Sequence, residues 1–165
     1  MIALHNFRPD DFAPMLDIVA DYRVVEMVGS WPWPAQPAFT KMRLTTPEAQ
    51  AGKVQAICVN GVLAGTIGLV RGEIGYLLGR RFWGQGFASK AVAGFLAELH
   101  ARFGPQVLLA GAYADNPASA RVLEKLGFIK FGEIDGKSDA RLEPRRMLQY
   151  RRQAALCMGQ GAGTQ

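Results

Sequence analysis

Residues 73–87 read EIGYLLGRRFWGQGF, and this stretch decides the fold that we expect for the chain. Its apolar first part, 73–78, is typical of a strand, and the glycine loop 81–86 leads into a helix that begins at Phe87. The first N–H groups of a helix have no partner inside the helix, and the helix dipole adds partial positive charge there. The stretch therefore predicts a phosphate-binding loop between a strand and a helix, with a simple turn as the alternative.

A second motif follows the loop and reads NPAS at 116–119 and VLEKLGF at 122–128. Asn116 and the proline after it suit the start of a helix, and Gly127 suits its end. In this order and at this separation, the two motifs resemble the GNAT acetyltransferase superfamily. They are most similar to its RimJ/RimL-type branch, which acts on ribosomal-protein N-terminal amines. The resemblance is strong over 73–132, looser over 1–72, and fades after Tyr150.

The composition fits an ordinary globular domain, with 49% hydrophobic residues, 20% charged residues and a net charge of +5. The sequence shows neither a long apolar run typical of a membrane helix nor a secretory signal pattern, so we expect a cytoplasmic protein. The basic residues are scattered, which argues against nucleic acid as the main ligand. Cys58, Cys157 and the two histidines lack the spacing of metal ligands, so we expect no metal site.

The periodicity along the chain predicts one α+β (mixed α/β) domain over 1–152 and a flexible tail over 153–165. A helix is expected over 12–22, capped by Asp10 or Asp11, and the alternating prolines and tryptophans after it predict a rigid loop. Residues 35–52 form no clear pattern. Strands are expected at 54–59, 62–70, 73–78, 107–113, 128–134 and 147–151, and helices at 87–103 and 117–126.

Strands 73–78 and 107–113 are joined through a helix, so we expect them to be parallel neighbours in an otherwise mostly antiparallel sheet. Helices are expected on both faces of that sheet. The GNAT resemblance implies the same mixed sheet. It also implies that the two parallel strands splay apart and that the co-substrate acetyl-CoA enters the gap between them.

The resemblance assigns the acetyl-CoA contacts to three segments. The pyrophosphate is expected on the glycine loop and the first helical turn, at Arg81, Gly84, Gln85, Gly86, Phe87, Ala88 and Ser89. The pantetheine arm is expected on the strand backbone at Leu77, Leu78 and Gly79, and on Asn116 and Ser119 of the second motif. The structural alternatives are a solvated surface position for Arg81 and a helix N-cap for Asn116.

Acetyl transfer from a thioester to an amine needs a neutral amine, a donor for the developing oxyanion and a proton for the leaving thiolate. Glu73 is our candidate base, with a solvated glutamate at a hairpin end as the alternative. The resemblance places the general acid at Ser119, which could instead bond locally in its helix, and Tyr113 is the other candidate. Trp31 and Trp33 are expected to bind the acceptor or, alternatively, to form a hydrophobic plug.

The function expected from the resemblance is an N-acetyltransferase that moves acetyl from acetyl-CoA to a primary amine by direct attack in a ternary complex. The acceptor is expected to be a protein N-terminus, an amino acid or a small amine. The alternative is a CoA-binding sensor or scaffold module of the same fold with little activity. No membrane partner is expected, and homodimers occur in this branch.

Overall fold

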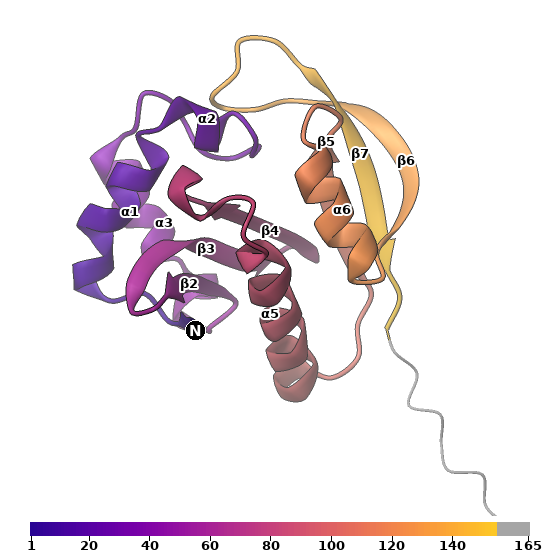
Figure 1. The fold of residues 1–165 in the computed structure, drawn as a ribbon, viewed down its shortest axis with the longest axis horizontal. Helices are drawn as coiled ribbons and strands as arrows, with labels where there is room; N and C mark the ends of the chain where they lie inside the picture. Colours follow the sequence, from indigo (N-terminus) through magenta and orange to yellow (C-terminus); the bar gives the residue numbers. More distant parts are fainter. Residues whose placement is uncertain (155–165) are drawn as a thin grey trace, which may run out of the picture.

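A seven-stranded sheet forms the centre of the protein in the computed structural model, which describes residues 1–154 (Figure 1). The strand order is β1-β2-β3-β4-β5-β7-β6, and every neighbouring pair is antiparallel except β4 and β5. The strands are β1 Ile2–His5, β2 Val54–Val59, β3 Val62–Val70, β4 Glu73–Leu78, β5 Leu108–Tyr113, β6 Ile129–Gly136 and β7 Arg145–Arg152. The mixed, mostly antiparallel sheet expected from the sequence is confirmed.

The parallel pair splays. β4 and β5 pair only at their first residues, where Glu73 lies opposite Leu109 and Ile74 lies opposite Ala110. Beyond these two pairs the strands separate toward their carboxyl ends. The unpaired backbone of both strands therefore borders a gap in the middle of the sheet.

Helices cover both faces of the sheet, as Figure 1 shows. The α-helices are α1 Phe12–Val19, α2 Tyr22–Val25, α3 Pro37–Leu44, α4 Pro47–Gln50, α5 Phe87–Phe103 and α6 Pro117–Lys125, and two 3-10 turns lie at Pro9–Asp11 and Arg80–Phe82. Two buried clusters separate these layers. One cluster packs α5 and α6 against the sheet through residues such as Phe95, Leu123 and Ile74, and the other packs α1 to α3 through Met15 and Val25.

Alternation along β4 decides which side chains reach which layer. Ile74, Tyr76 and Leu78 belong to the cluster on the α5 side, whereas Leu77 belongs to the cluster on the α1 side. Because side chains alternate between the faces of a strand, Glu73 and Gly75 share the face of Leu77. One face of β4 thus places the Tyr76 hydroxyl beside the gap, and the other face places the Glu73 carboxylate there.

The strand β1 is not among the strands expected from the sequence, and the first helices differ from the expectation in two further places. The helix expected over 12–22 ends at Val19, and a separate short helix begins after Asp21, whose carboxylate accepts the N–H of Arg23 as an N-cap. Asp11 does not cap α1, because its carboxylate accepts the N–H of Arg8 at 2.8 Å instead. These two differences in the helices come from local side-chain bonds to the backbone, and the spacing of apolar residues gives no sign of such bonds.

The remaining ranges agree closely with the expectation. Residues 35–52, which gave no pattern, form α3 and α4. The expected tail lies, except for its first two residues, outside the described residues, as does Cys157. None of the helices within the described range is long and apolar enough to cross a membrane.

Candidate functional site

A cleft of about 940 Å³ occupies the gap between β4 and β5 and reaches both faces of the sheet. On the α5 side it is lined by the glycine loop, the start of α5 and α6. On the α1 side it is lined by β3, the loop after α2 and part of α3. The predicted residues that line it are Trp31, Glu73, Leu77, Leu78, Gly84, Gly86, Phe87, Ala88, Ser89, Tyr113, Asn116 and Ser119.

The glycine loop ends in an uncapped helix. Gly84 and Gly86 adopt left-handed backbone conformations, with φ of 70° and 76°, and no atom lies within 4 Å of where a Cβ would stand on either residue. Gly86 is the N-cap of α5 and supplies no side chain to it. Within residues 1–154, the first-turn N–H groups therefore have neither an intrahelical nor a side-chain partner, and the loop leaves open space in front of them. This arrangement suits a bound phosphate.

Four predicted residues do not line the cleft: Gly79, Arg81, Gln85 and Trp33. The Gln85 side chain donates to the carbonyl of Arg81 at 2.8 Å, and the Arg81 guanidinium lies 4.7 Å from the centre of the Phe82 ring. These contacts stabilise the loop itself. Trp33 packs against Tyr22 with 47% of its surface exposed.

The backbone of β4 divides between β3 and the gap. Gly79 donates its N–H to Ala64 of β3 at 2.8 Å. Since hydrogen-bonding direction alternates along a strand, Leu77 also directs its backbone groups toward β3, and those of Tyr76 and Leu78 face the gap. The Leu78 carbonyl already accepts from the Trp83 indole at 2.7 Å, which leaves, among the described residues, the Leu78 N–H and both backbone groups of Tyr76 for a ligand.

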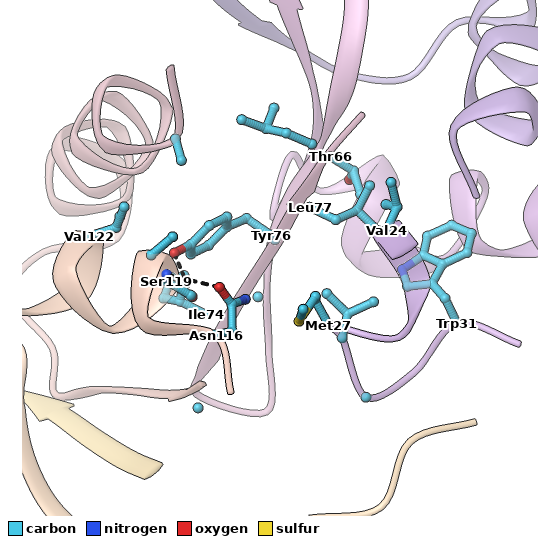
Figure 2. A pocket seen from close by; sticks show the side chains of 18 of the residues that line it. Val24, Met27, Trp31, Thr66, Ile74, Tyr76, Leu77, Asn116, Ser119 and Val122 are labelled. Atoms are coloured by element: carbon cyan, nitrogen blue, oxygen red, sulfur yellow. Dashed lines mark hydrogen bonds between the residues drawn. The ribbon is translucent and has the colours of Figure 1, made fainter. Parts of the chain in front are cut away.

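A pair of hydroxyl groups closes the α5 side of the gap. The Tyr76 hydroxyl lies 2.8 Å from the Ser119 hydroxyl, and Asn116 caps α6 by accepting the N–H of Ser119 at 3.3 Å (Figure 2). Burial raises the pKa of Tyr76, and the bond to Ser119 partly opposes that rise. Tyr76 therefore stays protonated at neutral pH and can pass a proton through Ser119.

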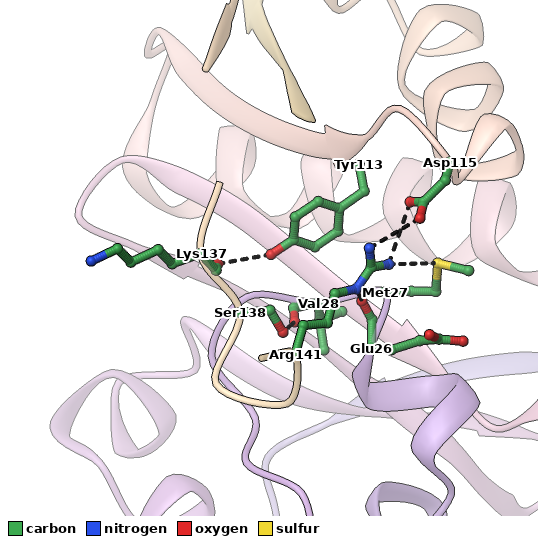
Figure 3. Close-up of polar contacts among 8 residues, drawn as sticks. All are labelled: Glu26, Met27, Val28, Tyr113, Asp115, Lys137, Ser138 and Arg141. Atoms are coloured by element: carbon green, nitrogen blue, oxygen red, sulfur yellow. Dashed lines mark hydrogen bonds and ion pairs between the residues drawn. The ribbon is translucent and has the colours of Figure 1, made fainter. Parts of the chain in front are cut away.

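Tyr113 lies in the cleft wall, but its hydroxyl is committed elsewhere. It donates to the carbonyl of Lys137 at 2.8 Å, and the Arg141 guanidinium lies 4.5 Å from the ring centre (Figure 3). Burial raises the pKa of Tyr113, while the neighbouring Ser138 and the charge of Arg141 oppose that rise. The ring thus anchors the loop between β6 and β7.

The α1 side of the gap holds a carboxylate beside an open floor. Glu73 is exposed at the start of β4, and its Oε1 lies 3.6 Å from where a Cβ of Gly111 would stand on β5. Gly68, Gly75 and Gly111 line the cleft on neighbouring strands, with Gly68 opposite Gly75. Val54 covers Gly68 and Met147 covers Gly111, but nothing lies within 4 Å of a Cβ at Gly75. Space for a substrate therefore lies directly above Gly75.

Trp31 forms an aromatic wall at the α1 end of the cleft. It is only 4% exposed and packs edge-on against Phe39, so it is both part of the core and part of the lining. In Figure 2, Leu77 points toward Val24 and Trp31, whereas Tyr76 points toward Ser119 on the other side of β4. The Arg43 guanidinium lies 5.1 Å from the Trp31 ring centre and 5.9 Å from that of Phe39. Burial lowers the pKa of Arg43, against the opposing charges of Asp139 and Glu48.

Neither Tyr76 nor Arg43 was among the residues expected at the site from the sequence. The sequence held a signal for Tyr76, because side chains alternate along a strand and Ile74, Tyr76 and Leu78 therefore share one face of β4. That face packs against α5 and α6. Arg43 lies in the segment without a pattern, so nothing in the sequence pointed to it. Among the described residues, no three His, Cys, Asp or Glu side chains gather as metal ligands would.

Comparison with known proteins agrees with this fold. The family model described as acetyltransferase (GNAT) domain matches residues 2–129, so the chain belongs to the GNAT acetyltransferase family. Within that family it is an acetyl-CoA-dependent N-acetyltransferase. No curated protein matches the chain in sequence.

Solved structures share the fold at low sequence identity. A GNAT-family acetyltransferase from Bacillus anthracis is 19% identical with a TM-score of 0.77, covering 92% of this chain and 94% of the other. A Salmonella typhimurium acetyltransferase that modifies the N-terminal serine of the 50S ribosomal subunit protein L7/L12 is 16% identical with a TM-score of 0.77, covering 92% and 94%. Mycobacterium smegmatis RimJ in complex with CoA-disulfide is 22% identical with a TM-score of 0.73, covering 96% and 84%.

Proposed function

We propose that the chain transfers the acetyl group of acetyl-CoA directly to a primary amine while both substrates occupy the cleft. The observation that carries this proposal is the gap between β4 and β5, which is open to both faces of the sheet. One face offers the uncapped α5 N-terminus and a hydroxyl pair, and the other offers a carboxylate above an open floor. Two substrates can therefore meet in the gap from opposite sides, which is what direct transfer requires.

The co-substrate side is the α5 side. The first-turn N–H groups after Gly86 bind the pyrophosphate, and the pantetheine arm runs along the gap-facing backbone of Tyr76 and Leu78. Arg121 and Lys125 of α6 line the same part of the cleft and supply positive charge for the nucleotide phosphates. The Mycobacterium RimJ structure holds CoA-disulfide in the same fold, which supports a CoA ligand here.

The acceptor side is the α1 side. Glu73 accepts a proton from the ammonium form of the acceptor, directly or through water, so that the neutral nitrogen can attack the thioester carbonyl carbon. The C–N bond forms, the carbonyl oxygen gains negative charge beside the Leu78 N–H, and the nitrogen, now cationic, loses its extra proton to water. The C–S bond then breaks, and the leaving thiolate takes the Ser119 proton. Tyr76 replaces that proton through the bond between the two hydroxyl groups, and water returns a proton to Tyr76.

The acceptor is a primary amine, and a protein N-terminus is one candidate, since the Salmonella relative modifies an N-terminal serine. Calorimetric titration with acetyl-CoA, followed by thiol-release assays with a panel of amines, tests the proposal. Micromolar binding together with thiol release supports it. Binding without thiol release for any amine would instead favour a sensor or scaffold. A cytoplasmic location stays a prediction.

A glycine variant with a matched control tests the phosphate loop. Gly86→Ala places a Cβ in the open space before α5, at φ of 76°, and we expect it to weaken acetyl-CoA binding about tenfold or more. Gly61→Ala is the control, because Gly61 has φ of 79° and equally open surroundings but lies in the β2–β3 turn, outside the cleft lining. Equal affinity for acetyl-CoA in the two variants would remove the loop from the binding site.

A further inference from the structure

The charges in the cleft are strongly one-sided. Five charged side chains line it, and Glu73 is the sole carboxylate among them within the described residues. The four cations are Arg43, Arg71, Arg121 and Lys125. Arg121 and Lys125 lie on α6 and face the co-substrate side, whereas Arg43 and Arg71 belong to the acceptor side. A cleft for a polycationic acceptor would need the opposite balance, because like charges raise the cost of binding.

Arg43 is the distinctive cation of the acceptor side. It comes from α3, and its guanidinium is held over two aromatic rings, those of Trp31 and Phe39. The two rings stand at 73° to each other, so at most one of them lies flat on the guanidinium, and both contacts leave its five N–H donors unused. The aromatic contacts therefore hold Arg43 in place without using its hydrogen bonds.

Those donors have no partner in the part of the chain that the structure describes. Neither an ion pair nor a side-chain hydrogen bond of Arg43 occurs between residues 1 and 154, although Asp139 and Glu48 are near enough to act on its charge. Arg141, which lies over the Tyr113 ring, by contrast donates to both carboxylate oxygens of Asp115 and to the carbonyl of Glu26. A partly desolvated and preorganised guanidinium without partners, in a cleft wall, suits an oxyanion ligand.

We propose that the acceptor is a primary amine that also carries an oxyanion, a carboxylate or a phosphate, and that Arg43 binds this oxyanion. This inference rests on the proposed function, because it describes the second substrate of the same cleft. The amine lies above Gly75 near Glu73, the body of the acceptor passes Leu77 and Val24, and the oxyanion meets Arg43 beside Trp31. Arg71, in the turn before β4, adds positive charge at the cleft border.

Matched acceptor pairs test the proposal. The probes are ω-amino acids of increasing chain length, β-alanine, 4-aminobutyrate and 6-aminohexanoate, each compared with its carboxamide. A phosphate arm compares 2-aminoethyl phosphate with ethanolamine. Each probe is measured twice, by kcat/KM for thiol release and by calorimetric binding to the protein saturated with CoA. We expect at least one acid to exceed its neutral partner about tenfold or more, since a hydrogen-bonded charge pair contributes that much.

Two variants assign the preference to Arg43. Arg43→Met removes the charge but keeps an apolar stem on Trp31, and it should abolish the difference between each acid and its neutral partner. Arg151→Met is the matched control, because Arg151 lies 6.0 Å from the Phe131 ring centre outside the cleft lining, and it should keep the preference. If the preference appears for the amino acids, Arg43 binds a carboxylate. If it appears for 2-aminoethyl phosphate, Arg43 binds a phosphate.

The two readouts separate the two proposals. Absence of thiol release with every probe would count against the acetyl-transfer proposal alone, because the calorimetric comparison still decides the oxyanion proposal. The oxyanion proposal would be overturned if acids and their neutral partners bound equally, or if Arg43→Met left a preference for the acids unchanged.

Discussion

The hydroxyl groups of Tyr76 and Ser119 lie 2.8 Å apart, although one belongs to β4 and the other to α6. Their bond crosses the border of the gap on the side where the co-substrate is proposed to bind. Because burial raises the pKa of Tyr76, the pair holds an exchangeable proton at neutral and moderately alkaline pH. The bond links two residues that are far apart in the sequence, and we propose that they donate a proton as one unit.

Removal of the Tyr76 hydroxyl should slow the chemical step. We expect Tyr76→Phe and Ser119→Ala each to lower kcat by about 10²-fold, since general acid catalysis contributes on that scale, and to change the Kd of acetyl-CoA little. Steady-state kinetics and calorimetry measure the two effects separately. Tyr150→Phe is a suitable control, because Tyr150 is also buried with a raised pKa but bonds Glu124 outside the cleft lining.

The pH profile gives a second test of the same unit. A tyrosine with a raised pKa keeps its proton as the pH passes through the ordinary tyrosine range, so the wild-type kcat should not fall there. If kcat fell as the pH was raised toward 9, and Tyr76→Phe abolished that fall, the assignment would be contradicted. Such a fall would mean that Tyr76 loses its proton early, which requires a lowered pKa of Tyr76.

Glu73 should act on the acceptor and not on acetyl-CoA. We expect Glu73→Gln to lower kcat/KM for the amine by about 10²-fold or more at neutral pH, because the amide cannot accept a proton. Acetyl-CoA affinity should stay the same, since Glu73 lies on the α1 face of β4. The loss should shrink as the pH approaches the pKa of the acceptor amine, where free neutral amine becomes available. Equal losses at every pH would remove Glu73 as the base.

The open floor at Gly75 offers a steric test of the acceptor side. Gly75→Val adds a β-branched side chain to a strand position without a left-handed backbone and with nothing within 4 Å of its Cβ, so the fold should tolerate it. The added side chain fills the space proposed for the acceptor. We expect KM for the amine to rise about tenfold or more, in line with the cost of overfilling a packed site, with the Kd of acetyl-CoA unchanged. A rise in that Kd instead would place Gly75 on the co-substrate side.

The sequence predicted the architecture well because the local signals agreed with the tertiary packing. The strand 73–78, the helix 87–103 and the cap of α6 at Asn116 are each encoded by short-range patterns, and Gly127 takes the expected left-handed conformation with φ of 85°. The site was predicted less completely. The bond between Tyr76 and Ser119 joins residues 43 positions apart, and the stacking of Arg43 on Trp31 depends on how α3 packs, which no local pattern records.

Arg141 should be the main clamp between the loop after α2 and the loop before α6. It is almost fully buried, donates to both carboxylate oxygens of Asp115 at 3.0 and 3.3 Å, and also bonds the carbonyl of Glu26 (Figure 3). Asp115 is half exposed, so the pair is partly screened. We expect Arg141→Met to lower the free energy of unfolding by about 1–3 kcal/mol, because it leaves the Glu26 carbonyl without its partner.

A double-mutant cycle with Asp115→Ala separates the pair from the other contacts of Arg141. The single Asp115→Ala variant should lose less stability than Arg141→Met, because Arg141 keeps its bond to Glu26 and its position over Tyr113. Chemical denaturation measures each corner of the cycle. If Asp115→Ala were as destabilising as Arg141→Met, the bond of Arg141 to the Glu26 carbonyl would contribute nothing measurable to stability.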